Sequence, residues 1–293
     1  MNRTARAGLW FAAPVVALTF LIVVVPTLGA ALLSVTDFDI YALGDVTRLR
    51  FVGLDNFAVL AHDPHFWRAA GNTLLFAALG VPATIAASLL AAVLIGSVTV
   101  RWRPVWRVLL FAPYVTTLVA TSVVWRTLLD TRFGPINAAL AAVGIGPVDW
   151  LGDARTSIPA IVLFLVWKNF GYNMVVFSAA LAMVPADLRD AARVDGAGPW
   201  LRFRHVVLPA IGPALLLATV LSVANFLQLF TEPYIMTHGG PAGSTTTVLY
   251  FMFEQGFTWW SLGMASAVAL VLFAAILGVT AVQARLGRRA EWL

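Results

Sequence analysis

The chain has 293 residues, of which 60% are hydrophobic and 11% are charged. A typical soluble domain is about 25% charged and needs a polar exterior, so these proportions exclude an ordinary soluble fold and favour lipid as the solvent. The net charge of +5 does not indicate nucleic-acid binding, because the basic residues lie between long apolar stretches, and the lack of cysteine excludes disulfides and thiolate chemistry.

Six stretches are long and apolar enough to cross about 30 Å of hydrocarbon as helices. We place them at 9–34, 71–97, 108–129, 157–184, 209–231 and 258–284. The first stretch follows two arginines, as a secretory signal does, but it runs past the roughly 7–15-residue core of a signal and is expected to stay uncleaved. The sequence therefore predicts an all-α integral membrane protein with six transmembrane helices in a single domain over residues 1–293.

Arginine is distributed unevenly around these stretches. The N-terminus, the 98–107 and 185–207 loops and the C-terminus hold 12 arginines, and the segments on the opposite side hold six. Cytoplasmic loops are enriched in Arg and Lys, so this bias predicts that both termini lie in the cytoplasm. An even number of spans is consistent with that orientation.

Several kinds of chemistry are absent from the sequence. A P-loop needs a lysine followed by Ser or Thr, but the one lysine, Lys168, precedes Asn169 inside a predicted span, so the chain carries no P-loop ATPase. His62 and His65 are three residues apart in an external loop, a pattern typical of solvated side chains, so neither a metal site nor a catalytic residue is predicted. No acid lies well inside a span, which weakens the interpretation as a proton-coupled transporter.

The internal 185–207 loop is the most informative segment. Leu188, Ala191, Ala192 and Asp195 fall at i, i+3, i+4 and i+7, on one face of a short helix that a glycine then ends. Small alanines on such a helix suit close docking against a partner. The alternative is a helix that lies at the lipid headgroups with its arginines on phosphate.

The same loop resembles the EAA loop of binding-protein-dependent ABC importer permeases. The family pattern is Glu-Ala-Ala, three residues, Gly, nine residues, then an apolar residue with Leu-Pro. Here Asp190, Ala191 and Ala192 are followed by Asp195 and Gly196, and Leu-Pro closes the loop. The first position is the shorter acid, so a direct contact there would differ in reach. The resemblance implies that these five residues form the ATPase-coupling loop.

Other stretches resemble the sugar-transport branch of that family, especially the class of the larger maltose permease subunit. They lie in the first span with its exit, in the first external loop and in the last external loop: Ala13, Pro14, Pro26, Ser34–Asp37, Phe51–Phe57, Phe66–Trp67 with Asn72–Thr73, and Thr237–Pro241 with Ser244–Thr246. With the internal loop, these matches are distributed along nearly the whole chain. The resemblance implies the type I ABC importer permease fold in a bacterial plasma (inner) membrane.

The resemblance also implies partners. A second permease subunit, two cytoplasmic ATPase subunits and an extracytoplasmic substrate-binding protein are expected beside this chain, in contact with membrane lipid. ATP and Mg are then bound by the ATPases, and this chain holds no cofactor and is not an enzyme. The implied mechanism is alternating access, with the coupling loop carrying the motion of the ATPases to the spans.

Polar residues inside spans are costly and are functional candidates by default. By resemblance to the maltose permease, the regions around Gly171 and 225–228 line the substrate cavity, and amides with aromatic rings suit a neutral sugar. The predicted path residues are Phe170, Gly171, Asn173, Asn225, Phe226 and Gln228. The alternative for them is hydrogen bonding between helices.

Lys168 leaves the substrate class open. Its ammonium group either reaches the membrane interface, pairs with an acid of the other subunit or favours an anionic substrate. The remaining hypotheses are therefore a sugar importer, an ABC permease for a polyol or glycerol phosphate, and a stand-alone secondary transporter, which would not explain the long internal loop.

Overall fold

The computed structural model describes residues 3–41, 49–97 and 99–289. Within these ranges all regular elements are helical, apart from two isolated β-bridges that join Thr36 to Phe51 and Asp39 to Ser261. The all-α prediction is confirmed. The chain divides into two compact units, Met1–Trp67 with Phe251–Ala274 and Arg68–Tyr250 with Ala275–Leu293, which are described separately. The single domain over residues 1–293 stays a prediction.

Each of the six predicted spans has a helical counterpart in the described residues. Four are long apolar helices: Trp10–Leu33, Pro64–Gly96 within α4 (Pro64–Ser97), α8 (Ser157–Met183) and α15 (Leu262–Arg289). Two are bent pairs: Arg103–Val115 with Leu118–Leu128, at 95°, and Pro199–Ala210 with Gly212–Leu227, at 72°. Counting each bent pair as one span gives six, as predicted.

The bends are where the structure departs from the predicted spans. The third span, expected as one straight helix over 108–129, is divided into α5 (Arg103–Val115) and α6 (Leu118–Leu128). Pro113 weakens the end of α5, because proline removes a backbone donor and clashes with the preceding turn. The fifth span starts ten residues before the predicted 209, because the end of the internal loop is itself helical.

The first unit begins with α1 (Arg3–Thr19), the π-helical turn η1 (Phe20–Val24) and α2 (Val25–Leu33). After α2 the chain turns, and the Asn56 side chain holds that turn by donating to the carbonyl oxygens of Ser34 and Thr36, both at 2.8 Å. Asn56 lies on α3 (Asp55–His62). This amide therefore ties the exit of the first span to the first external helix.

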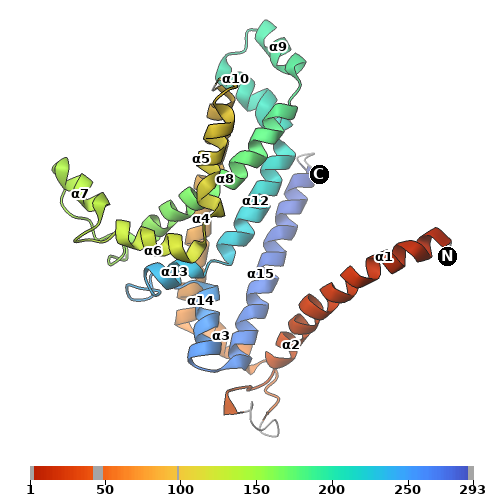
Figure 1. Ribbon diagram of the computed structural model, residues 1–293. Coiled ribbons are helices and arrows are strands. Elements are labelled where there is room, and N and C mark those ends of the chain that lie inside the picture. The colour runs from red at the N-terminus through yellow and green to blue at the C-terminus, as the bar shows by residue number, and fades with distance from the viewer. Residues whose placement is uncertain (1–2, 42–48, 98, 290–293) are drawn as a thin grey trace. The chain divides into compact units, whose positions relative to one another are not determined.

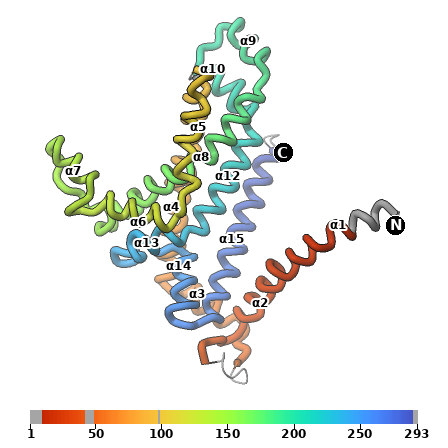
Figure 2. Tube along the Cα trace, viewed as in Figure 1, coloured from red at the N-terminus to blue at the C-terminus, as the bar shows by residue number. Residues whose placement is uncertain are grey.

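The second unit is built around α8, which packs between α5 and α12 (Gly212–Leu227) (Figure 1). Its core is aromatic and aliphatic: Phe164 and Phe177 on α8 are fully buried, as is Phe76 on α4. The tube in Figure 2 shows the chain turning sharply between α5 and α6, and α6 packs against α13 (Thr231–Met236). These contacts fix the walls of the polar cavities described next.

The remaining helices connect these elements. α7 follows α6, four short helices lie between α8 and α12, and α14 and η5 precede α15. Their bounds are Pro135–Ala142 for α7, Ala186–Val194 for α9, Pro199–Arg202 for α10, Phe203–Val207 for η4, Leu208–Ala210 for α11, Val248–Phe253 for α14 and Glu254–Thr258 for η5.

Candidate substrate path and coupling loop

A cavity of about 480 Å³ lies between α8, the end of α12, the start of α13 and the α5–α6 break. Its polar and aromatic lining consists of Tyr114, Thr116, Lys168, Asn169, Asn225, Phe226, Gln228, Phe230, Thr231 and Glu232, and leucines complete the walls. A second cavity of about 200 Å³ shares four of these side chains and adds Thr84, Tyr172, Asn173, Leu221 and Ser222. Amides and hydroxyls donate to and accept from solute hydroxyl groups.

Four of the predicted path residues meet at these cavities. Asn225, Phe226 and Gln228 line the larger one, and Asn173 joins Asn225 and Phe226 at the smaller one. The Asn225 and Gln228 side chains are exposed, whereas Asn173 is buried and its Nδ2 donates to Ser222 Oγ at 3.1 Å. Asn225 and Gln228 are three residues apart and so lie on one face at the end of α12. Contact with a solute stays a prediction for all four.

Phe170 and Gly171 lie elsewhere on α8. Phe170 lines a separate, almost wholly apolar cavity of about 490 Å³ with Trp106 and Trp167. Gly171 lies where α8 crosses α5, and a Cβ at that position would overlap the carbonyl oxygen of Leu110. Neither residue lines the polar cavities. The close approach of Leu110 gives Gly171 a packing role, and its part in the path stays a prediction.

Lys168 is buried and bound by the protein itself. Its Nζ donates to the carbonyl oxygens of Pro113, Tyr114 and Thr116 at 2.6, 3.2 and 2.5 Å, and to Thr116 Oγ1 at 3.0 Å. These carbonyls lie at the C-terminal end of α5, where a helix has no intrahelical donors left and carries partial negative charge. The ammonium group therefore caps α5 and holds the chain at the α5–α6 break.

Glu232 is the acidic residue nearest to this arrangement. It is 5% exposed, lines the larger cavity and attracts the Lys168 ammonium group electrostatically. It is the second residue of α13, which begins after its N-cap residue Phe230. In the described part of the chain, no three His, Asp or Glu side chains come together as metal ligands.

Sequence reasoning did not find the α5–α6 side of the cavity. Tyr114 and Thr116 lie inside the stretch that was expected to be a straight span, and Tyr114 stacks on Tyr172 with ring centroids 5.1 Å apart. The available signals were Pro113 and the consecutive threonines 116 and 117, which together favour a break in a helix.

The predicted coupling loop forms a short exposed helix, α9, directly after α8. Its C-terminus closes as a Schellman motif: Gly196 N donates to Arg193 O at 3.1 Å, Ala197 N donates to Ala192 O at 3.0 Å, and Gly196 has φ of 77°. A residue other than glycine is strained in this left-handed conformation. The described side chains of α9 include no buried residue, so this helix is open to a partner.

The predicted acids of the loop have local roles in the structure. Asp190 Oδ1 lies 3.7 Å from Arg193 Nη1 on the same helix, and both side chains are about two-thirds exposed. An exposed ion pair of this kind contributes little to stability. Asp195 is the C-cap residue of α9. Function at the ATPase stays a prediction for both acids and for the alanines Ala191 and Ala192.

The last external loop is pinned to the start of α4. Asn72 Nδ2 donates to the carbonyl oxygens of Gly243 and Thr246, both at 2.9 Å, and the backbone N–H of Val248 donates to Thr73 Oγ1 at 2.9 Å. Within the loop, Thr245 is fully buried. Two segments that the sequence analysis singled out separately therefore form one structured surface.

Comparison with known proteins finds a matching family and several relatives of this chain. Residues 88–292 match the family described as binding-protein-dependent transport system inner membrane component. The lactose transport system permease protein LacF of Rhizobium radiobacter is 33% identical, over 90% of this chain and 88% of its own. The sn-glycerol-3-phosphate transport system permease protein UgpA of Yersinia pestis is 34% identical, over 94% of this chain and 92% of its own. The trehalose/maltose transport system permease protein MalF of Thermococcus litoralis is 28% identical, over 98% of this chain and 95% of its own.

The fold also has a solved counterpart. A bacterial ABC transporter involved in the import of the acidic polysaccharide alginate superposes with a TM-score of 0.82 at 22% identity, covering 97% of this chain and 96% of the other. The expected type I importer permease fold is thereby confirmed. The family match covers more than half of the chain, and relatives above 30% identity span nine-tenths of it. This chain belongs to the family of binding-protein-dependent transport system inner membrane components.

Proposed function

We propose that this chain is a permease subunit of an ATP-driven importer of neutral carbohydrates and that it forms half of the translocation path. The observation that carries the substrate class is the larger cavity, where exposed amides and aromatic rings line the walls while the Lys168 ammonium group is already bound to four protein oxygens. An ammonium group with its three donors in use offers little to an anionic solute. Two relatives carry lactose and trehalose/maltose in their names.

The proposal includes the substrate-binding protein that the family description implies and the other partners expected from the resemblance. A substrate-binding protein delivers the solute, a second permease completes the path and two ATPases bind ATP and Mg, so this chain is non-catalytic. Arginine bias supports termini in the cytoplasm, with α9 on the ATPase side. Reporter fusions to residues 3 and 289 should both report a cytoplasmic location, and an external signal from either one contradicts the orientation.

The short link between α8 and α9 supports direct coupling. α8 ends at Met183 and α9 begins at Ala186, with only Val184 and Pro185 between them. A displacement of α9 by an ATPase therefore moves the helix that carries Lys168 and Asn173. Since Lys168 binds the α5–α6 break, the break follows the motion of α8, and the cavity walls shift together.

The test is uptake by the complete complex in proteoliposomes. Labelled neutral disaccharides should be accumulated when ATP is inside, and sn-glycerol 3-phosphate should neither be accumulated nor compete. The binding protein has its own specificity, so binding of each solute to the isolated binding protein is measured in parallel. Accumulation of glycerol phosphate, with no uptake of neutral sugar, would overturn the proposed substrate class.

A further inference from the structure

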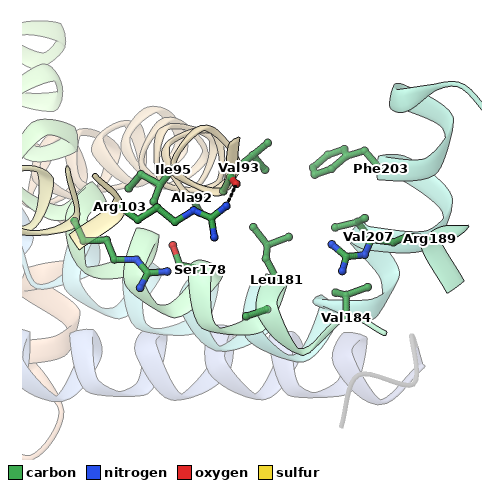
Figure 3. A pocket seen from close by; sticks show the side chains of 13 residues that line it. Ala92, Val93, Ile95, Arg103, Ser178, Leu181, Val184, Arg189, Phe203 and Val207 are labelled. Atoms are coloured by element: carbon green, nitrogen blue, oxygen red, sulfur yellow. Dashed lines mark hydrogen bonds between the residues drawn. The ribbon is translucent and has the colours of Figure 1, made fainter. Parts of the chain in front are cut away.

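A third cavity, of about 400 Å³, lies between the ends of α4 and α8, the start of α5, and the short helices α9 and η4 (Figure 3). It contains none of the predicted path residues. Its walls are largely apolar, with Val93, Leu181 and Phe203 among the lining side chains. All the long helices around it begin or end at this level, which places the cavity at the height of the lipid headgroups.

Three arginines line this cavity. Arg103 and Arg107 are four residues apart on α5 and so share a face, and Arg189 reaches the cavity from α9. Figure 3 shows Arg103 and Arg189 on opposite sides of it. Arg103 is half-buried and donates to Gly96 O at 2.7 Å, whereas Arg107 and Arg189 are exposed. None of the described lining residues is acidic, and the exposed Arg107 and Arg189 leave positive charge on the wall.

A buried hydroxyl group points to a missing ligand. Ser178 on α8 is 9% exposed, lines the same cavity and has an Oγ without a hydrogen-bond partner. In Figure 3 it faces the side of the cavity that carries Arg103. Buried hydroxyls in native proteins are nearly always satisfied, and an unsatisfied one indicates an unseen partner. A phosphate oxygen accepts from both guanidinium and hydroxyl donors.

We propose that Arg103, Arg107, Arg189 and Ser178 bind the phosphate of an anionic membrane lipid, with its acyl chains against the apolar walls. The combination of guanidinium groups, apolar surface and headgroup depth favours a lipid over a free anion, since basic pockets between spans at this level recognise anionic headgroups. A phosphate held between α5 and Arg189 also ties the predicted coupling helix α9 to the membrane.

The experiment uses the complete importer complex in nanodiscs of phosphatidylcholine doped with spin-labelled phosphatidylglycerol or spin-labelled phosphatidylcholine. The wild-type complex should immobilise the anionic probe preferentially. The double variant Arg107→Gln/Arg189→Gln changes only exposed side chains and should lower the preference about fivefold for each charge removed, the equivalent of about 1 kcal/mol each. Adding Ser178→Ala should lower it further.

A matched control removes the same number of charges elsewhere. Arg285→Gln/Arg288→Gln lies on the same predicted side of the membrane, outside the cavity, and should keep the wild-type preference. If the cavity double variant keeps the wild-type preference for the anionic lipid, the proposal is overturned. Displacement of the lipid probe by inorganic phosphate, which would indicate a free-anion site, also overturns it.

Discussion

The cavity beside α8 and the helix α9 that follows it are built in opposite ways. The cavity is assembled from groups far apart in the sequence, with Lys168 holding the α5–α6 break some fifty residues earlier. α9 is formed by its own residues: a helix of nine residues closed by Gly196 in a left-handed conformation, with no buried side chain among those described.

This difference separates the consequences of mutation in the two regions. A change in the cavity removes a tertiary contact and alters the shape of the path, whereas a change in α9 leaves the bundle intact and alters only the surface offered to a partner. Substitutions in the two regions should therefore have different signatures: altered stability or solute affinity for the cavity, and altered coupling to ATP hydrolysis for α9.

The largest effect is expected from Lys168→Met. Methionine fills a similar volume but cannot donate, so the carbonyl oxygens at the end of α5 lose their partner, at a cost of about 1–3 kcal/mol for each buried acceptor left unsatisfied. We expect a lower Tm of the purified complex and little uptake. Spin labels on cysteines at exposed Val108 and Val123, introduced into a chain with no native cysteine, should report a broader distance distribution across the break.

The neighbouring position supplies the matched control. Asn169 Nδ2 donates to Leu165 O within α8 at 2.9 Å, so Asn169→Leu removes one local hydrogen bond and no contact with the break. It should leave the label distances unchanged. If Lys168→Met and Asn169→Leu give the same Tm and the same distances, Lys168 does not hold the break.

The next effect concerns the end of α9. Gly196→Val forces a β-branched residue to a φ of 77°, at a cost of roughly 1–2 kcal/mol, and should displace the segment after the helix. We expect sugar-stimulated ATP hydrolysis to fall while the Tm of the permease stays near the wild-type value. Gly196→Asn is the control, because asparagine tolerates this conformation, and it should retain most of the stimulation. Equal activity of both variants and the wild type would show that this turn has no part in coupling.

A smaller effect is expected in the path. Asn225→Ala and Gln228→Ala each remove an exposed amide from the cavity wall and should each weaken transition-state or ground-state contacts with a sugar by about 0.5–1.5 kcal/mol. The KM for uptake should therefore rise several-fold while the Tm and the basal ATP hydrolysis are unchanged. Asn173→Ala tests the packing alternative. The Asn173 amide donates to Ser222, so its loss should lower the stability of the complex more than it changes the KM. Unchanged uptake kinetics in the first two variants would assign those amides to packing.

The smallest effect is expected from Asp190→Ala. The Asp190 carboxylate makes an exposed ion pair at 3.7 Å with Arg193, and such pairs contribute between 0 and about 1 kcal/mol. Helix α9 should persist, and ATP hydrolysis should change by less than about twofold on that basis. A complete loss of ATPase binding would instead show that Asp190 contacts the ATPase directly.

The contrast between the regions also explains what could be predicted from the sequence. Local periodicity predicts α9, glycine predicts its end at Gly196, and apolar length predicts α8. The structure has all three within a few residues of the predicted positions. The break at Thr116 has local signals, but its contact with Lys168 and the contact of Asn72 with the external loop join residues far apart in the sequence, and no local pattern reveals these contacts. Gly171 looked like a path residue for the same reason: its contact with Leu110 exists only after α5 and α8 pack.

The central claim is that the cavity holds the solute and α9 couples it to ATP hydrolysis. The most direct measurement is the number of ATP molecules hydrolysed per sugar accumulated by the complete complex in proteoliposomes. Ala191→Glu places a charge on the open face of α9 and should raise this ratio, whereas Asn225→Ala/Gln228→Ala should raise the KM and leave the ratio unchanged. A raised ratio in the cavity variant, together with a normal ratio in Ala191→Glu, would contradict this division of roles.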